Sequence, residues 1–306
     1  MLRFAVARLI RSVVTLWLVV TAVFVVLRLT GDPAQAMLPD DATPEQIEAF
    51  RLQFGLDEPL LVQYLKYWAN LAQGNFGESL RERRPVVDMV QARLGATLLL
   101  AGAAIAIGLL LGIPAGILAA LTRNSPWDRL LMGLAFIGQS APNFFIGILL
   151  ILLFSLQLKW LPSAGSESPQ HLLLPAVTLA TGLLAALARM TRSSLLEVIR
   201  QDYIRVARAK GLSRWQVISG HALRNAAIPL VTVFGMLTGG MIGGAAITET
   251  VFAWPGIGRL AVGAIAIRDY PVIQFIVLMV ATSVIIVNLV VDVLYGLLDP
   301  RIREQA

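Results

Sequence analysis

The sequence predicts an all-α, polytopic membrane protein with six transmembrane helices. The chain has 306 residues, a mean hydropathy of +0.74 and only 14% charged residues, whereas about a quarter of a soluble domain is charged. Backbone exposed to lipid must satisfy its hydrogen bonds within its own segment, which favours helices, and no alternating strands of a membrane barrel are visible. The apolar runs, each near or above the roughly 20 residues that cross a bilayer, are 13–29, 95–121, 130–158, 172–188, 228–247 and 272–298.

The first run, 13–29, has some features of a secretory signal, because arginines precede it and the small-residue segment 34–36 follows it. Its apolar core is longer than the about 7–15 residues of such signals, and it carries Arg28. We therefore expect an uncleaved membrane anchor.

Two helices are expected in the long loop after the first run. Thr43–Gln46 has the pattern of a capped helix start with proline at the first helical position, and Gly55 is expected to end that helix. A second amphipathic stripe ends near Gly74 and is expected to pack on the outer rim of the protein. Its apolar members are Leu61, Tyr64, Leu65, Trp68 and Leu71.

Glycines recur at four-residue spacing in the second and fifth runs. Small residues on one helical stripe let two backbones approach closely, which is how helices associate in lipid. We interpret both stripes as packing seams, and helix sliding during gating is the alternative. The stripes are Gly108, Gly112 and Gly116, and Gly235, Gly239 and Gly243.

The third run contains polar side chains around Pro142. Gln139, Ser140 and Asn143 are the best candidates for polar groups of a translocation path, and Pro142 is placed to interrupt the helix. A proline kink with no ligand contact is an equally good interpretation.

Two acidic residues lie near or within apolar runs. Glu249 is expected to begin an outside segment in which Trp254–Gly258 indicates a re-entrant turn, which needs protein or a cavity to cover it. Asp292 lies in the last run, one turn after Asn288, where an ionisable group is costly. A structural pairing of Asp292 with a cation on a neighbouring helix is favoured over a proton relay.

The distribution of lysine and arginine predicts both termini in the cytoplasm, because short cytoplasmic loops carry an excess of positive charge. With that orientation the short outside loops hold only Lys159, Arg259 and Arg268, and the richest cytoplasmic loop is 189–227. Its cations are Arg189, Arg192, Arg200, Arg205, Arg208, Lys210, Arg214 and Arg224.

The segment 202–229 combines this charge with a helix-turn-helix pattern. Tyr203, Val206, Ala207 and Lys210 recur at helical spacing, and Gly211 then stops the helix, as glycine does at a C′ position. A second apolar stripe continues into the fifth run. This pattern indicates a docking device that lies on the membrane surface.

The same segment carries a resemblance to a known family. "ARAKGLSRWQVISGHALRNAAIP" resembles the cytoplasmic EAA loop of binding-protein-dependent ATP-binding-cassette (ABC) importers, in the variant of the peptide/nickel permeases, and "DYIRVARAKG" preceded by "TRSSLLEV" fits that variant well. The likeness covers nearly the whole chain. Other matching stretches are 54–80, 174–180, 249–260, 268–274 and 299–303, while 83–88 and 170–175 are closest to glutathione- and dipeptide-type members.

The resemblance implies the type I ABC importer permease fold and a single permease domain, 1–306, with an extracytoplasmic loop, 30–94, and a cytoplasmic coupling loop, 189–227. It implies a multi-pass subunit of the bacterial inner membrane that imports peptide-like solutes, with nickel chelates or opine-like solutes as alternatives. The alternative to packing on the rim is that the helices of the loop 30–94 help to receive the binding protein. The residues expected to couple to an ATPase are Tyr203, Arg205, Val206, Ala207, Arg208, Lys210, Gly211 and Leu212.

The resemblance also implies the partners, which are a second homologous permease, two ABC ATPase subunits and an extracytoplasmic solute-binding protein, but no nucleic acid. Lys66, Lys159 and Lys210 are the only lysines and none follows a glycine, so the chain has no phosphate-binding P-loop. ATP and Mg²⁺ are therefore expected on the partner ATPases, with no cofactor or metal in this chain.

The residue types of an active site are also missing. The chain has no cysteine and two histidines, and it lacks the His-Glu-x-x-His and Gly-x-Ser-x-Gly patterns. We expect a transport subunit and not an enzyme. An ion-gradient-driven transporter is a less favoured alternative, because neither inverted repeats nor paired ionisable residues at the midplane are evident.

Overall fold

The computed structural model describes residues 2–39, 41–213 and 216–298, and in these ranges the fold is all-α, with one isolated bridge between Glu78 and Pro85 as the extended pairing. Contacts divide the chain into two compact units. Unit 1 comprises Met1–Thr97 and Pro255–Ser283, and unit 2 comprises Leu98–Trp254 and Val284–Ala306.

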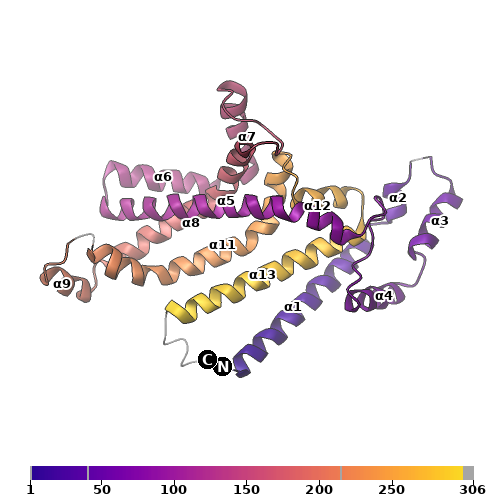
Figure 1. Ribbon diagram of the computed structural model, residues 1–306, viewed down its shortest axis with the longest axis horizontal. Coiled ribbons are helices and arrows are strands. Elements are labelled where there is room, and N and C mark those ends of the chain that lie inside the picture. Colours follow the sequence, from indigo (N-terminus) through magenta and orange to yellow (C-terminus); the bar gives the residue numbers. More distant parts are fainter. Residues whose placement is uncertain (1, 40, 214–215, 299–306) are drawn as a thin grey trace. The chain divides into compact units, whose positions relative to one another are not determined.

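Unit 1 is built around the start of α5, α12 and the start of α13. Val86, Met89, Ile257 and Val272 are almost fully buried in its core. An N–H···O bond of 2.8 Å from Ile257 to Thr97 Oγ1 ties α12 to α5. The helices that belong wholly or partly to this unit (Figure 1) are α1 Leu2–Leu29, α2 Pro33–Met37, α3 Pro44–Phe54, α4 Leu60–Ala72, α5 Val86–Leu121, α12 Ile257–Ala266 and α13 Tyr270–Leu298.

The two helices predicted in the loop 30–94 are present as α3 and α4. Thr43 is the N-cap of α3 and forms a complete capping box with Gln46, Pro44 occupies the first turn, and Gly55 ends the helix with a φ of 63°. Because the side chains of Thr43 and Gln46 satisfy backbone donors that the helix leaves free, the start of α3 is fixed locally.

Unit 2 is arranged around α8, which packs against α6, α7 and α11. The apolar window of α8 is 61% buried, whereas that of α5 is 33% buried, so α8 is the central helix. Figure 1 shows α6 running alongside α8, and α7 rising at a steep angle to α6. The further elements of this unit are α6 Pro126–Ser140, α7 Asn143–Leu150, a π-helix Ile151–Gln157, a 3-10 helix Pro169–Leu172, α8 Leu173–Val198, α9 Asp202–Ala209, a π-helix Val217–Ala222 and α11 Leu223–Val251.

The glycine stripe of α5 is a packing seam, as predicted. A Cβ added at Gly112 would lie 2.9 Å from the backbone oxygen of Leu184, and one at Gly116 would lie 2.5 Å from that of Ala188. The close approach of α5 to α8 therefore requires glycine at these positions.

The stripe of α11 makes a second seam with α13. A Cβ on Gly235 would lie 2.4 Å from the side chain of Val291, and one on Gly239 would make ordinary contact with Val287 at 3.9 Å. The predicted third member, Gly243, lies outside the residues whose side chains are described.

An ion pair joins α6 to α8. Arg192 Nε and Nη2 donate to the two carboxylate oxygens of Asp128 at 2.6 and 2.8 Å, and Asp128 also accepts the backbone N–H of Asn124 at 2.9 Å. Asp128 is only 3% exposed. A buried carboxylate is tolerated because this bidentate geometry and the extra donor compensate for its lost hydration.

Four helices of the described residues are long and apolar enough to span a membrane, and two bent pairs raise the number to as many as six. The predicted run 130–158 corresponds to one of these pairs, in which Pro126–Ser140 and Asn143–Gln157 are bent by 112°. The interruption of the third run that Pro142 was expected to cause is therefore present. The physical reason is Pro142, which has extended backbone angles at the start of α7 and lacks the N–H that would continue α6.

Candidate functional site

The candidate site in the loop 189–227 is the short helix α9 and the turn that ends it. Leu212 N–H donates to the carbonyl of Ala207 at 3.4 Å and Gly211 N–H donates to that of Arg208 at 3.0 Å. These are the two bonds of a Schellman motif. Gly211 has a φ of 78°, which confirms the predicted helix stop and explains why glycine occupies this position.

One face of α9 is buried against the rest of the loop 189–227. Ile204 and Ala207 are 0% and 6% exposed and form a cluster with Val217 and Ala222 of the following π-helix, and Leu212 packs on it. This cluster, which we call the α9 mount, holds α9 on the chain that leads directly into α11.

The opposite face of α9 is open to a partner. Tyr203 and Val206 are 41% and 54% exposed, and the side chains of Arg205, Arg208 and Lys210 are exposed on the same helix and its cap. A large apolar pair surrounded by cations is a suitable surface for another protein. We call this set the α9 outer face.

The structure thus separates the predicted coupling residues into two groups. Ala207 and Leu212 belong to the mount, so their side chains do not reach the outer face, and Ile204 is a mount residue that the sequence analysis missed. Tyr203 connects the groups, because its hydroxyl accepts a hydrogen bond of 2.7 Å from Asn225 Nδ2 on α11. Ile204 could have been found from its spacing, because a residue three positions before Ala207 lies on the same face of the helix.

The polar residues of the third run lie at the break between α6 and α7. Gln139 and Ser140 are exposed and Asn143 is half-buried. Among the described residues their side chains have no hydrogen-bond partner, whereas Pro142 O accepts the first N–H groups of α7. The structure therefore brings the three predicted residues together as free polar groups between two helices of a bent span.

The region around Glu249 differs from the prediction. Glu249 does not begin an outside segment, because α11 continues to Val251 and buries this residue completely. The turn that follows closes with a 2.8 Å bond from Trp254 N–H to Glu249 O, and α12 then begins at Ile257. The side chain of Asp292 lies outside the described residues, so its pairing stays a prediction.

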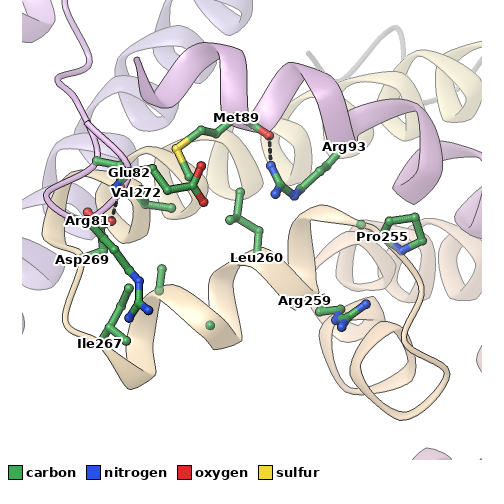
Figure 2. Close-up of a pocket in the computed structure, with 14 residues that line it drawn as sticks. Arg81, Glu82, Met89, Arg93, Pro255, Arg259, Leu260, Ile267, Asp269 and Val272 are labelled. Atoms are coloured by element: carbon green, nitrogen blue, oxygen red, sulfur yellow. Dashed lines mark hydrogen bonds between the residues drawn. The ribbon is translucent and has the colours of Figure 1, made fainter. Parts of the chain in front are cut away.

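Unit 1 contains a cavity of about 510 Å³ between α5, α12 and the turn 79–82. Figure 2 shows Met89 of α5 and Glu82 facing Leu260 of α12, with Arg93 bent back onto the carbonyl of Met89. The sequence analysis missed this cavity, although it had singled out three of the stretches that line it, 54–80, 249–260 and 268–274. The charged residues of its wall are Arg81, Glu82, Arg93, Arg259 and Asp269.

A buried carboxylate fixes one wall of this cavity. Asp269 is 2% exposed and accepts hydrogen bonds from Ser79 Oγ at 2.5 Å and from Leu80 N–H at 3.1 Å. Ser79 Oγ in turn accepts the N–H of Glu82 at 2.9 Å. Asp269 therefore ties the turn 79–82 to the start of α13 within unit 1.

Comparison with known proteins identifies the family. The family described as "binding-protein-dependent transport system inner membrane component" matches residues 112–304, and the N-terminal family of the same membrane component matches residues 1–101. The chain belongs to this family. It is therefore a multi-pass inner-membrane component of a binding-protein-dependent ABC importer and not an enzyme.

Curated relatives match over the full length. The glutathione transport system permease protein GsiC of Escherichia coli (strain K12) is 45% identical over 304 residues, which cover 99% of both chains. The protein of the same name from Shigella dysenteriae serotype 1 (strain Sd197) has the same identity and coverage.

Solved structures show the fold. The MetNI methionine ABC transporter in an inward-facing conformation matches with a TM-score of 0.61 at 21% identity, covering 70% of this chain and 98% of that one. A second crystal form of the same transporter matches with a TM-score of 0.56. The chain thus has the permease fold of an ABC importer, and such a permease works with an ATPase and a solute-binding protein.

Proposed function

We propose that this chain is the permease subunit of an importer for peptide-like solutes of the glutathione, dipeptide or oligopeptide class. The observation that carries the proposal is the 45% identity over 99% of both chains to glutathione transport permeases. A match that extends over the whole length includes the loops that differ most between importers, so it is stronger support than a shared fold.

Uptake in cells tests this proposal. Cells that lack their own glutathione and dipeptide importers, and that express the complete transporter, are expected to take up labelled glutathione or dipeptides only when ATP is available. Nickel-chelate or opine uptake in place of peptide uptake would assign one of the alternative solutes. Uptake that survives ATP depletion and collapses with an uncoupler would contradict ATP-driven import.

We propose that α9 is the coupling helix, with its outer face in contact with a partner ATPase. Tyr203, Arg205, Val206, Arg208 and Lys210 supply this contact. The mount residues Ala207 and Leu212, with Gly211 in the Schellman turn, hold α9 so that its displacement reaches α11. ATP binding then changes the population of inward- and outward-open states through its differential affinity for them.

The translocation path is proposed to pass the break between α6 and α7. Gln139, Ser140 and Asn143 are free hydrogen-bonding groups at this point, and unsatisfied polar groups within a membrane segment are stable only where water, solute or protein reaches them. In this proposal they take the place of water around the polar groups of the solute.

The complete transporter is proposed to contain this chain, a second homologous permease, two ATPase subunits and one solute-binding protein. ATP and Mg²⁺ are bound by the ATPase subunits, because this chain has no P-loop, and no cofactor or metal is assigned to it. Both termini and α9 face the cytoplasm, which the excess of cations in 189–227 supports.

A further inference from the structure

Helix α4 carries an apolar face that is turned away from the protein. Leu60, Leu61 and Leu65 are 60%, 68% and 59% exposed, and Ala69 and Ala72 are exposed on the same helix. The predicted packing of the whole stripe on the rim is therefore wrong for Leu61 and Leu65. If this face were in water, the protein would forgo the hydrophobic stabilisation of three leucines, which is about 1.5–3 kcal/mol for each side chain that is fully buried.

The polar residues of α4 point in the other direction. Gln63, Lys66 and Asn70 help to line a cavity of about 540 Å³ within unit 1. Gln63 Nε2 donates to the carbonyl of Glu58 at 2.8 Å, and Lys66 forms an ion pair with the Glu58 carboxylate. A helix on the surface of a soluble protein has the opposite arrangement, with its apolar stripe inward and its polar face outward.

Contacts with α1 place α4 beside the end of a membrane span. The Tyr64 hydroxyl is 2.9 Å from Thr21 Oγ1, and the Tyr64 ring meets the edge of Phe24 at 5.2 Å. Gln63 Oε1 accepts a 3.0 Å bond from Arg28 Nε. Since Thr21 lies eight residues before the end of α1 at Leu29, these contacts cover about the last 12 Å of the span.

Helix α1 also exposes apolar side chains over the stretch that α4 contacts. At the same level α1 exposes Val25, Val26 and Leu29, by 46%, 54% and 79%, and this helix spans the membrane, where such side chains meet lipid. A helix that lies along the interface with its apolar face at the acyl boundary reaches about 5–10 Å into the bilayer. The level of α4 on α1 fits that depth.

We propose that α4 is an interfacial helix that lies in the membrane surface, with Leu61 and Leu65 inserted among the phospholipid acyl chains. Its polar residues remain on the protein cavity, and Tyr64 and Tyr67 lie between α4 and α1, at the depth where aromatic side chains are enriched. The assignment does not depend on the solute or on the orientation of the chain. It gives α4 a lipid partner in place of the solute-binding protein.

Site-specific fluorescence tests the assignment, because the chain contains no cysteine and single cysteines are unique in it. L61C and L65C are labelled with an environment-sensitive fluorophore in the assembled transporter, whose other subunits are cysteine-free. The complex is reconstituted in phosphatidylethanolamine–phosphatidylglycerol vesicles with and without acyl-spin-labelled phospholipid. K66C on the cavity side of α4 and Q73C at its exposed C-cap are the matched controls, and complex assembly is checked by size exclusion.

The proposal predicts blue-shifted emission and a marked loss of fluorescence with spin-labelled lipid for L61C and L65C. Iodide in the aqueous phase should quench K66C and Q73C more strongly, and saturating solute-binding protein should not protect L61C from lipid quenching. Iodide quenching of L61C and L65C without lipid quenching would show that this face is in water. Quenching by neither agent, or loss of lipid quenching on adding the binding protein, would show a protein partner. Each of these results would overturn the proposal without bearing on the transported solute.

Discussion

Gly211 shows at the scale of a single residue how backbone conformation fixes the end of α9, the proposed coupling helix. Its φ of 78° is one that residues with a Cβ rarely adopt, and its N–H closes the Schellman turn that ends α9. We predict that Gly211→Ala costs about 1 kcal/mol of local stability and reduces import, and that the β-branched Gly211→Val abolishes import while the complex still assembles. Uptake and size-exclusion profiles measure the two effects.

Gly220 is the matched control for this prediction. It lies in the same loop, has no positive φ, and a Cβ added to it would meet nothing within 4 Å. Gly220→Ala is therefore expected to import at the wild-type rate. Wild-type uptake by Gly211→Val would contradict the role assigned to the turn.

The ion pair between Asp128 and Arg192 is a second interaction of individual residues that stabilises the fold, because it joins α6 to α8. Removing the guanidinium in Arg192→Ala leaves a buried carboxylate without its counter-ion, and such a change destabilises proteins by about 3–5 kcal/mol. The double variant, which also carries Asp128→Ala, should lose less than the sum of the two single variants. A double-mutant cycle on thermal unfolding in detergent measures this coupling, and additive losses would mean that the pair contributes nothing to holding α6 on α8.

At the scale of elements, the seam between α5 and α8 depends on the absence of a Cβ. A methyl group at Gly116 would lie 2.5 Å from both the Ala188 oxygen and the Thr191 Cβ. We predict that Gly116→Ala forces the helices apart and destabilises the protein by about 1–3 kcal/mol, which is the usual cost of overpacking. Thermal unfolding of the purified subunit or complex measures the effect.

Gly102 on the same helix is the control for the seam. A Cβ there meets nothing within 4 Å, so Gly102→Ala should be neutral or slightly stabilising, since alanine is the better helix former. Equal losses from both substitutions would indicate that helix propensity, and not contact with α8, decides the stability of α5.

Local sequence signals predicted where helices begin, end and pack closely, but not how one helix is oriented relative to the next. The capping box at Thr43, the stops at Gly55 and Gly211 and the glycine seams were predictable, because each depends on chemistry within a few residues. The sequence indicated an interruption at Pro142 but not the bend angle of 112°. That angle depends on the packing of α7 on α8, and such a contact between distant segments cannot be predicted from local helix propensity.

The sequence predicted the helix α9 and its glycine stop, but not which of its residues are buried in the mount and which lie on the outer face. Helical spacing placed Ala207 with Tyr203 and Val206, whereas the structure turns Ala207 inward because Val217 and Ala222 fold back onto α9. The pairing of Asp128 with Arg192, which are 64 positions apart, was likewise invisible, and Arg192 could be counted only as a cytoplasmic cation.

At the scale of the whole molecule, the charge distribution predicts the orientation of the chain. Lys159 and Lys210 are both exposed, and the predicted six-span topology places them on opposite sides of the membrane. K210C in a complex without other cysteines should react with a membrane-impermeant maleimide only in inverted vesicles, and K159C only in right-side-out cells. Labelling of both from the same side would contradict the N-in, C-in assignment.

The central claim concerns the outer face of α9 and its ATPase partner, and crosslinking from Val206 tests it most directly. In the intact transporter, V206C carrying a short photoreactive crosslinker is predicted to capture the ATPase subunit, with a yield that changes when a non-hydrolysable ATP analogue is added. I204C, two residues away and buried in the mount, should not capture it. An assembled and active complex in which V206C never captures the ATPase would contradict the account.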